Sequence, residues 1–419
     1  MRYILHSDLN NFYASVECMY NPKIRNNGVA VVGDSEKRHG IVLAKNNIAK
    51  SCGVKTGDTI WEAKLKCPNL VTVTAHFDRY QKISRLVKNM YREYTDQMES
   101  FGIDEAWLDI THRVHNWKEA VELANTIRKR VIEEFGVTVS IGVSFNKVFA
   151  KLGSDIKKPN ATTLISDKNF KEIVYPLPVE QLLYVGNRTK AKLNKNNIFT
   201  IGDLAEADQN FMRLLIGKVG VMLRHMARGE ENEEVRWADE KEDVKSISNS
   251  TTCPRDLKNE KEVKSIVYIL SESVARRTRS EGFFAKEVSL HIKDGALKSY
   301  GWHKRLEFST NLASDIAREC MQLFKNYTWD TTIRAVGVRV SGFENQPSQM
   351  SIFYDKFSHD KIEKIENIVE NLRERWGYDI IKRGVVVADK DMAGLDPYSA
   401  PHVIHPISYL KGGIKDDQA

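Results

Sequence analysis

The sequence predicts a mixed α/β (α+β) protein of several domains, and three observations support this class. The chain has 419 residues, which is enough for more than one hydrophobic core. Strand-like and helix-like patterns alternate over residues 1–165 and again over residues 246–345. A densely charged stretch, residues 230–245, precedes the second region and has the composition of a tether.

The first region has the order strand, helix, strand, strand, helix, strand, which is the order of a ferredoxin-like domain. Its expected elements are a strand at 1–5, a helix from 12, a helix at 77–98, a hairpin around 104, a helix at 118–135 and a strand at 137–143. Residues 19–74 interrupt this order with strands at 29–33 and 40–44 and a short helix at 46–52 that ends at Gly53.

Residues 166–232 have a helical pattern of their own. Within them, Leu182–Leu193 resembles a helix-hairpin-helix, a motif whose backbone amides hold a DNA phosphate at the hairpin glycine. Gly186 would be that glycine, although such hairpins commonly carry two. An ordinary packing corner between two helices fits the same segment, so both interpretations stay open.

The second region predicts another α/β layer, in which two helices with an apolar stripe alternate with strands at 286–293 and 332–341. The side chains expected to face inward are Val263, Ile266, Val267, Leu270, Val274, Val288, Leu290, Ile292, Leu312, Ile316, Cys320, Leu323, Val336, Val338 and Val340. The last strand also carries Arg334 and Arg339, which give the sheet a polar and basic outer face.

Composition narrows the classes of protein without choosing one. The chain has 63 Lys and Arg against 56 Asp and Glu, a net charge of +7 and a pI of about 8.9, which is compatible with a polyanionic partner. The five cysteines are scattered without a CxxC, which argues against a disulfide framework and a zinc site. Asp8 comes too early for a signal peptide, and no apolar run reaches membrane-spanning length, so we expect a cytoplasmic protein without a membrane partner.

Adjacent carboxylates at Asp104 and Glu105 stand in an otherwise apolar stretch. Neighbours on a strand point to opposite faces, so both side chains can converge only at a turn or bulge. A solvated hairpin turn is the simpler interpretation of such a pair. Asp8, which follows the first expected strand and precedes a helix, supplies a second acidic centre. Three carboxylates without a His or Cys cluster suit Mg²⁺ or Mn²⁺, and paired ions of this kind support phosphoryl transfer.

Three segments resemble, in the same order, the motifs of the Y-family, or translesion, DNA polymerases. They are Asp8–Glu17, Gly102–Asp109 and Ser144–Lys151, the last continued by Lys157–Asn160. The resemblance covers about residues 1–350 and is stronger in the first half. It implies that Asp8, Asp104 and Glu105, with the backbone carbonyl of Leu9, hold two Mg²⁺ ions, for which Mn²⁺ can substitute.

The resemblance also implies a right-hand polymerase fold. Its expected parts are a ferredoxin-like palm (1–18 and 75–165), small fingers (19–74), a helical thumb with the helix-hairpin-helix (166–232), a linker (233–245), an α/β little finger that lies against DNA (246–345), and a clamp-binding peptide with a tail (346–419).

Aromatic residues follow Asp8 on the expected helix. Phe12 and Tyr13 would lie at the sugar of the incoming nucleotide, and Tyr13 would be the steric gate that excludes a ribose 2′-hydroxyl. Packing in a core is the alternative for this pair. The prediction of a gate therefore depends on the acidic motif beside it.

The phosphates of the incoming nucleotide would contact Lys158, Asn47 and Lys50. Many relatives carry a tyrosine and an arginine where this chain has Asn47 and Lys50, so the grip on the phosphates is less certain. This departure, together with Asn10 in place of a second aspartate, points within the bacterial polymerase IV and V branches towards the polymerase V catalytic subunit.

Residues after the second region resemble a peptide by which bacterial polymerases bind the sliding clamp. Gln349 would make polar contacts, and Met350, Ile352 and Phe353 would fill an apolar pocket; a buried strand is the alternative. Residues 359–384 then predict a helix that either docks on the little finger or binds a partner.

The expected function is a template-directed, low-fidelity DNA polymerase of the lesion-bypass type. Primer-template DNA, a deoxynucleoside triphosphate and the sliding clamp would be its partners, and we expect a monomer. A nucleotide cyclase could use a similar domain and metals without DNA. A non-catalytic DNA-binding scaffold is the other alternative, because basic modules bind phosphates without catalysis.

Overall fold

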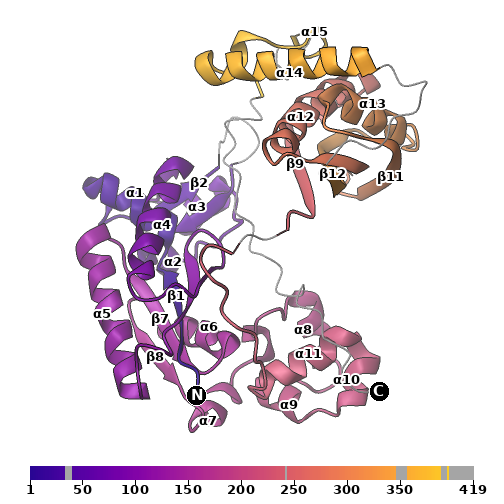
Figure 1. The fold of residues 1–419 in the computed structure, drawn as a ribbon. Helices are drawn as coiled ribbons and strands as arrows, with labels where there is room; N and C mark the ends of the chain where they lie inside the picture. Colours follow the sequence, from indigo (N-terminus) through magenta and orange to yellow (C-terminus); the bar gives the residue numbers. More distant parts are fainter. Residues whose placement is uncertain (34–39, 241–242, 346–355, 388–393, 396–419) are drawn as a thin grey trace. The chain divides into compact units, whose positions relative to one another are not determined.

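The structure is a computed structural model that describes residues 1–33, 40–240, 243–345, 356–387 and 394–395, with residues 356–359 described by their backbone alone. The described residues form two compact units, residues 1–33 with 41–240 and residues 243–387 (Figure 1). Each unit buries a hydrophobic core of its own. Each is therefore described by itself.

A five-stranded sheet in the order β5-β6-β1-β7-β8 is the centre of the first unit. Strand β1 lies between β6 and β7 and pairs antiparallel with both, whereas β8 is parallel to β7. The first four strands with α4 and α5 have the predicted ferredoxin-like order. The strands are β1 (Ile4–Leu9), β5 (Met98–Ser100), β6 (Glu105–Asp109), β7 (Val139–Ser144) and β8 (Thr162–Ile165).

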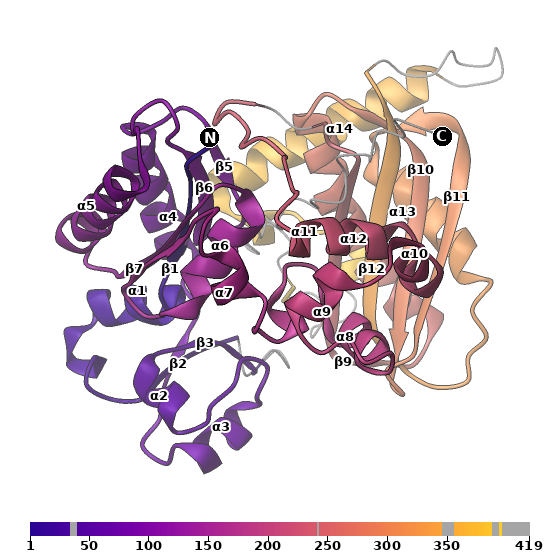
Figure 2. The ribbon, with the colours of Figure 1, turned by 90° about the horizontal axis from the view of Figure 1, so that it is seen from below.

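Helices cover both faces of this sheet (Figures 1 and 2). On one face, α4 (Phe77–Arg92) and α5 (Trp117–Phe135) share a core with α1 (Phe12–Tyr20). On the other face, α6 (Lys147–Ile156) packs on β1, β7 and β8. Gly142 on β7 permits this close packing, because a Cβ there would lie 1.8 Å from the carbonyl oxygen of Ala150.

A smaller three-stranded sheet, in the order β3-β2-β4, is inserted between α1 and α4. Its elements are η1 (Pro22–Ile24), β2 (Val29–Val32), β3 (Val42–Lys45), α2 (Asn47–Ser51), α3 (Ile60–Lys66) and β4 (Val71–Thr74). The two strands and the short helix were predicted to within two residues, and Gly53 ends the helical turn with φ +87°. The sequence patterns did not predict α3 and β4.

Short helices follow β8 and have a core of their own, which includes Phe149 of α6. They are α7 (Phe170–Val174), η2 (Val179–Gln181), α8 (Asn187–Asn194), α9 (Ile201–Glu206), α10 (Gln209–Ile216) and α11 (Lys218–Ala227). The segment before Gly186 is the single 3₁₀ turn η2, so the predicted helix-hairpin-helix has one full helix, α8, instead of two.

The second unit contains a four-stranded antiparallel sheet in the order β11-β10-β12-β9, with α12 and α13 on its inner face. Its elements are β9 (Ser246–Leu257), α12 (Glu260–Ser280), β10 (Phe284–Asp294), β11 (Ser299–Thr310), α13 (Ala313–Phe324) and β12 (Ile333–Glu344). All the side chains predicted to face inward are buried. The outer strands β9 and β11 were not predicted, because they are mainly polar and lack a clear alternation.

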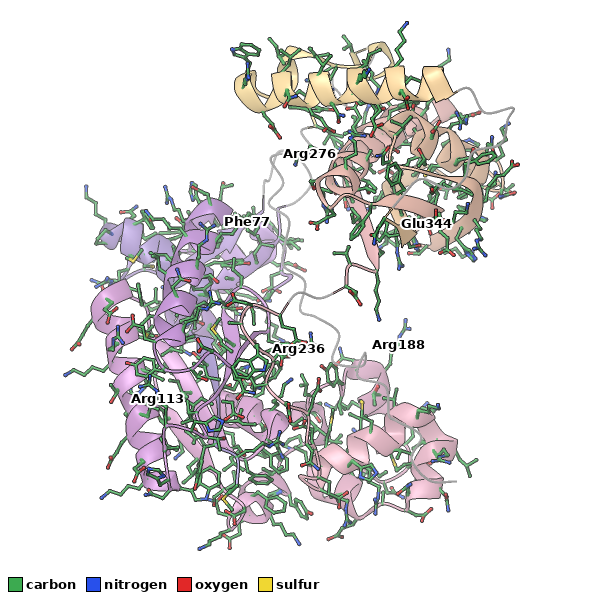
Figure 3. The ribbon with its side chains drawn as sticks, in the orientation of Figure 1. Phe77, Arg113, Arg188, Arg236, Arg276 and Glu344 are labelled. Atoms are coloured by element: carbon green, nitrogen blue, oxygen red, sulfur yellow. The ribbon has the colours of Figure 1, made fainter. Side chains whose placement is uncertain are left out.

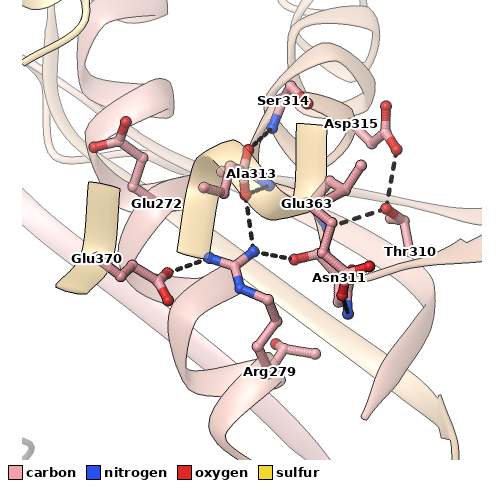
Figure 4. Close-up of polar contacts among 12 residues, drawn as sticks. Glu272, Arg279, Thr310, Asn311, Ala313, Ser314, Asp315, Glu363 and Glu370 are labelled. Atoms are coloured by element: carbon pink, nitrogen blue, oxygen red, sulfur yellow. Dashed lines mark hydrogen bonds and ion pairs between the residues drawn. The ribbon is translucent and has the colours of Figure 1, made fainter. Parts of the chain in front are cut away.

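The C-terminal helix α14 (Lys356–Trp376), followed by η3 (Tyr378–Ile380) and α15 (Gly384–Val387), docks on the second unit through charged side chains (Figure 4). Arg279 of α12 donates to Glu366 of α14 at 2.8 Å and also pairs with Glu370. Glu272 of α12 accepts from Arg373 of α14 at 3.0 Å. The structure thus selects docking from the two alternatives that the sequence left open for this helix.

Two segments differ from the sequence prediction. The helix predicted over 77–98 ends at Arg92, because Met98 is buried as the first residue of the edge strand β5. The predicted tether is not free over residues 231–239, which lie along the first unit. Val235 is buried there, and the backbone oxygen of Glu233 accepts from Arg2 at 2.9 Å (the neighbouring Arg236 is labelled in Figure 3). An apolar side chain within a charged stretch explains this docking.

The predicted clamp-binding peptide, Gln349, Met350, Ile352 and Phe353, lies outside the described residues. Among the helices that the structure describes, none combines the length and the apolar character needed to cross a membrane.

Candidate active site

Three carboxylates from distant parts of the chain meet at one end of the five-stranded sheet. Asp8 on β1 is the direct pairing partner of Glu105, the first residue of β6. Asp104 lies in the bend before β6, and its backbone oxygen accepts a hydrogen bond of 3.0 Å from the Leu9 N–H. The antiparallel register therefore brings Asp8 to the acidic pair, and the bend frees Asp104 from the alternation of the strand.

Lysine side chains neutralise two of these carboxylates. The Lys158 ammonium lies 2.6 Å from Asp8 Oδ2 and 2.7 Å from Asp155 Oδ1. Lys151 of α6 pairs with Glu105. Burial alone would lower the pKa of Lys158, but the charges of Asp8 and Asp155 raise it. Lys158 therefore carries its charge next to the acids, where it can also meet an anionic substrate.

The three carboxyl groups have different affinities for protons. Burial, together with the charges of Glu105 and Asp104, raises the pKa of Asp8 to about 7 despite the opposing effect of Lys158. Burial and the charge of Glu105 also raise the pKa of Asp104. Burial opposes ionisation of Glu105 as well, but nearby His6 and Lys151 outweigh it and lower its pKa to about 2. A further cation would therefore favour the ionised forms of Asp8 and Asp104.

His6 is fully buried behind Glu105. Its Nδ1 lies 2.9 Å from Ser154 Oγ of α6, and its Nε2 lies 3.3 Å from Glu105 Oε2 without hydrogen-bond geometry. Burial lowers the pKa of His6 to about 4, so the ring is neutral at physiological pH. His6 therefore lies against Glu105 as a buried, neutral ring.

The oxygen donors of Asp8, Asp104 and Glu105 fit a hard divalent cation such as Mg²⁺. The raised pKa values of Asp8 and Asp104 are the observation that supports this fit, because a bound cation would remove the cost of ionising them. In the arrangement that the structure describes, no three acidic, His or Cys side chains are already grouped as ligands of one ion. Asp8 pairs with Lys158 and Glu105 pairs with Lys151 instead.

An aromatic platform lies beside the acids. Tyr13 of α1 stacks on Tyr80 of α4 with ring centroids 4.2 Å apart and an angle of 9° between the ring planes. Phe77 meets Tyr13 edge-on at 5.8 Å, and buried Phe12 packs against Tyr80. Burial and the charge of Asp104 raise the pKa of Tyr13. Tyr13 is half-buried, so one part of its ring remains accessible.

A hydrogen bond to a buried carboxylate holds Tyr80 in place. Its hydroxyl donates to buried Glu17 of α1 at 2.6 Å, and Glu17 also accepts from Arg79 at 3.0 Å. The stacking partner of Tyr13 is thus held by a hydrogen-bonded carboxylate and cannot easily move aside.

Asn10 contributes to the site by holding the loop that carries Lys158. Its Oδ1 accepts from the Asn160 N–H at 2.8 Å, and its Nδ2 donates to Ser140 Oγ at 3.0 Å. Asn10 is buried, and both of its polar atoms are engaged in these contacts. This asparagine therefore helps to hold the loop that carries Lys158.

The amino end of α1 is open to an anion. Asn11 precedes the helix with φ +48° and makes no capping hydrogen bond, and the first turn contains no acidic residue. The Asn11 side chain instead donates to Asn47 Oδ1 of α2 at 2.9 Å. Lys50 lies exposed on the same short helix. Uncapped backbone N–H groups at a helix start attract phosphate.

The residues expected to contact DNA lie elsewhere. Gly186 precedes α8 in an extended conformation, and a Cβ there would meet nothing within 4 Å, so space is open above the uncapped helix start. Arg188, two residues later, is exposed (Figure 3). Arg339 is exposed on the outer face of β12 in the second unit, and Arg334 of the same strand is half-buried.

Sequence reasoning missed His6, Lys151, Ser84 and Lys88 as parts of the site. Ser84 and Lys88 of α4 bind the backbone oxygens of Ile103 and Gly102, directly before Asp104. The alternation of β1 places His6 on the same face as Asp8, and this signal could have identified it. No sequence pattern links α4 to the acidic bend.

Comparisons with known proteins agree with this architecture. Residues 7–155 match the model of the impB/mucB/samB family, and residues 244–352 match the model of the C-terminal domain of that family. Among curated proteins, the chain is 47% identical to DNA polymerase IV of Acetivibrio thermocellus over 394 residues, which covers 93% of this chain and 99% of that protein. It is 33% identical to DNA polymerase IV 1 of Bacillus subtilis, covering 93% of this chain and 94% of that protein.

Two solved structures share the fold. One is a Y-family DNA polymerase chimera, with a TM-score of 0.73 and 22% identity, covering 82% of this chain and 100% of that chain. The other is a Dbh ternary complex, with a TM-score of 0.59 and 22% identity, covering 81% of this chain and 98% of that chain.

The ferredoxin-like sheet, its acidic hairpin and the second α/β unit define the class of Y-family polymerases. Within this class the chain belongs to the impB/mucB/samB family. The predicted fold class is thereby confirmed. The relatives named here carry the polymerase IV name, whereas Asn10, Asn47 and Lys50 had pointed towards the polymerase V catalytic subunit.

Proposed function

We propose that this chain is a template-directed, low-fidelity DNA polymerase of the lesion-bypass type, whose catalytic centre is formed by Asp8, Asp104 and Glu105. The observation that carries the proposal is the register of β1 and β6, which pairs Asp8 with Glu105 and bonds Leu9 to Asp104. Family membership and the polymerase IV name of its relatives support the same function.

The reaction joins a primer 3′-oxygen to the α-phosphorus of a nucleotide, while the bond between the α- and β-phosphates breaks and diphosphate leaves. Two Mg²⁺ ions held by Asp8, Asp104, Glu105 and the Leu9 carbonyl would lower the pKa of the primer hydroxyl and neutralise the leaving diphosphate. The residues themselves supply position and charge. Lys158, paired with Asp8 in the absence of substrate, would turn its ammonium to the phosphates.

The incoming nucleotide would lie between the aromatic platform and the amino end of α1. Its sugar would rest on Phe12 and Tyr13, with Tyr13 as the steric gate against a 2′-hydroxyl. Its phosphates would reach the first-turn amides of α1, Asn47 and Lys50.

We assign the parts of a polymerase hand to the observed elements as follows: palm, 1–18 and 75–165; fingers, 19–74; thumb, 166–232; linker, 233–245; little finger, 246–345; clamp-binding peptide and tail, 346–419. Gly186 of the thumb and Arg334 and Arg339 of the little finger would contact DNA phosphates. The inserted sheet of the fingers has three short strands, and such a small cover over the nucleotide supports tolerance of damaged templates.

Primer extension tests the proposal. We expect Mg²⁺-dependent extension by the wild-type chain and its loss in Asp104→Ala/Glu105→Ala. Glu133→Ala is the matched control, because Glu133 forms only an exposed ion pair with Lys129 on α5. Equal extension by the double variant and the control would refute the assignment.

Copying past an abasic site tests lesion bypass, and failure on every lesion with good activity on intact template would refute that part.

The remaining partners rest on sequence. Gln349, Met350, Ile352 and Phe353 would bind the sliding clamp, so replacing Gln349 and Phe353 should abolish clamp pull-down and leave synthesis on short primers intact. We also propose that the protein is a monomer of the cytoplasm, where DNA is its substrate. No disulfide joins the described cysteines, in keeping with a reducing compartment.

A further inference from the structure

Two cysteines lie together in the segment that is inserted between α1 and α4. Cys52 directly follows α2 and is exposed, whereas Cys67 directly follows α3 and is buried in the core of the insertion. Their thiols lie within hydrogen-bonding reach of each other, and no disulfide joins them in this structure. One accessible thiol therefore has a protected thiol as its neighbour.

The packing of the insertion brings the Cys67 sulfur against α2. A Cβ built on Gly28 would lie 2.8 Å from the Cys67 sulfur and 3.7 Å from the Cα of Ala49, which is fully buried on α2. Ala49 and Cys52 are three positions apart, so both lie on the face of α2 that is turned to this core. The side chain missing at Gly28 thus leaves the room in which the Cys67 sulfur approaches α2.

The other thiol is open to a reagent. Gly53 follows Cys52 with φ +87°, and a Cβ there would meet no atom of the described residues within 4 Å. Lys50 in the last turn of α2 and Lys64 in the last turn of α3 are exposed. Their charges favour the approach of a small anionic disulfide, for which glutathione disulfide is the natural probe.

The buried thiol is poorly suited to react with a solute directly. Burial and the neighbouring Cys52 thiol raise the pKa of Cys67, so that it stays protonated at neutral pH. Its sulfur is also screened from solvent, with 6% of the residue exposed. Cys52 is therefore the group that a reagent meets first, and Cys67 is placed to react with Cys52.

We propose that Cys52 and Cys67 form a redox-sensitive pair, which a small anionic disulfide converts into an intramolecular disulfide. In the first step the Cys52 thiolate attacks one sulfur of glutathione disulfide, the S–S bond of that molecule breaks, and one glutathione leaves and takes up a proton. In the second step Cys67 loses its proton and attacks the Cys52 sulfur of the mixed disulfide, and the second glutathione leaves. Two cysteine thiols are oxidised, and one glutathione disulfide is reduced to two glutathione molecules.

This modification is additional to the proposed polymerase function and does not depend on it. The new bond would tie the end of α2, the helix that carries Asn47 and Lys50, to the end of α3. A disulfide of this kind is expected to be reversible, because disulfides in reducing compartments are usually transient.

Peptide mapping of the full chain without reductant, after incubation with glutathione disulfide, tests the pair. We expect the wild type to lose both thiols to a Cys52–Cys67 disulfide and to retain no glutathione, and dithiothreitol should restore the thiols. Cys67→Ser should instead keep glutathione on Cys52, because the attacking thiol is missing. Cys52→Ser should form neither product. Cys18→Ser is the matched control, since it removes a buried thiol of the same unit and should form the same disulfide as the wild type.

Glutathione that stays on Cys52 in the wild type as fully as in Cys67→Ser would overturn the pair, because Cys67 would then not reach Cys52. An unreacted Cys52 would overturn it as well. Since Cys67 is buried, thermal unfolding of Cys67→Ser should be compared with that of the wild type. If that variant fails to fold, the presence or absence of the Cys52–Cys67 disulfide in the wild-type chain still decides the proposal.

Discussion

Asp8 occupies a position in which its charge is disfavoured until a cation arrives. It is only 6% exposed and lies beside Glu105 and Asp104, and these surroundings raise its pKa to about 7 although Lys158 is within 2.6 Å. Functional sites commonly hold groups whose placement lowers the stability of the fold. The acidic centre should therefore be a local weakness of the metal-free protein.

We expect Asp8→Asn to stabilise the metal-free protein at pH 8 by roughly 2 kcal/mol and to abolish primer extension. Because the folded pKa lies above the unfolded one, Asp8 contributes stability below about pH 4, and this contribution is lost as the pH rises to about 7. The gain in Asp8→Asn should therefore be present at pH 8 and small at pH 4. Urea denaturation in the presence of EDTA at both pH values measures it.

Glu133→Gln serves as the control for this measurement, because Glu133 is exposed and should show no such dependence on pH. A lower stability of Asp8→Asn at pH 8 would mean that the ion pair with Lys158 outweighs the cost of burying the charge.

Tyr13 should control the choice of sugar. We expect Tyr13→Ala to raise incorporation of ribonucleotides relative to deoxyribonucleotides by about 10- to 100-fold, because in the proposed binding mode its ring would fill the space that a 2′-hydroxyl needs. Tyr80 and Glu17 hold that ring in place from the opposite side. Tyr20→Ala, at the exposed end of the same helix, should leave the ratio unchanged. An unchanged ratio in Tyr13→Ala, measured by primer extension, would reject the gate.

The sequence identified the acids but not the groups around them. Asp8 and the Asp104–Glu105 pair were recognisable because their motifs resemble a known family. His6 and Lys151 influence Glu105 only through the pairing of β1 with β6 and the packing of α6 on the sheet. Such contacts depend on tertiary packing, and a linear pattern does not record them.

At the scale of elements, α4 holds the bend that presents Asp104. The Lys88 ammonium donates to the Gly102 oxygen at 2.6 Å and to Ser100 Oγ at 2.7 Å, and Ser84 donates to the Ile103 oxygen. Burial lowers the pKa of Lys88 to about 8 against the attraction of Asp104. Gly102 has φ +104°, a backbone conformation that glycine adopts readily and other residues rarely do. The bend is therefore fixed both by its own glycine and by the hydrogen bonds from α4.

We expect Lys88→Met to lower kcat for primer extension about tenfold with little change in the KM for DNA, because the acids lose their alignment and the DNA contacts remain. Lys88→Arg should recover part of the activity, and the Mg²⁺ concentration for half-maximal rate should rise in Lys88→Met. Lys82→Met is the control, since Lys82 is exposed on the same helix. Parallel losses in both methionine variants would show a general effect on α4 instead.

The C-terminal helix α14 shows a limit of pattern-based prediction. The sequence carries isoleucines at helical spacing here, yet Ile365 and Ile368 are 50% and 58% exposed, and the docked face carries Glu366 and Arg373. Arg279 and Glu272 of α12 compensate these buried charges. A charged docking face cannot be recognised from one sequence. Charged residues are mostly exposed, so each one is predicted to face solvent unless its partner is known.

This docking makes a prediction about stability. We expect Arg279→Leu to destabilise the second unit by about 3 kcal/mol, since half-buried Glu370 would lose its partner and buried Glu366 would keep only Arg383 and two backbone N–H groups. Arg318→Leu should cost less than about 1 kcal/mol, because Arg318 is exposed and pairs with Asp315 at the surface. Chemical denaturation monitored by tryptophan fluorescence compares the two. If Arg279→Leu costs no more stability than Arg318→Leu, the charged contacts of α14 contribute little to the stability of this unit.

For the whole molecule, we expect the chemical step to depend on the first unit and part of the DNA binding to depend on the second. The acids, the aromatic platform and the proposed phosphate contacts all belong to the first unit, whereas Arg334 and Arg339 belong to the second. Each unit has its own core. Substitutions on the outer sheet of the second unit should therefore affect DNA affinity and spare catalysis.

The salt dependence of DNA binding tests this division. Each phosphate contact that is lost should flatten the plot of log K against log salt concentration by about 0.9, so Arg334→Ala/Arg339→Ala should reduce the slope by up to about 1.8. The exposed Arg339 should account for most of the change, because Arg334 is half-buried. Fluorescence anisotropy with a labelled primer-template at several salt concentrations gives the slope, and Arg318→Ala on α13 is the control.

Single-turnover extension with saturating DNA should stay at the wild-type rate, since the acids are untouched. An unchanged slope would place the DNA on another surface of this unit, and a slower single turnover would mean that the outer sheet also affects the chemical step.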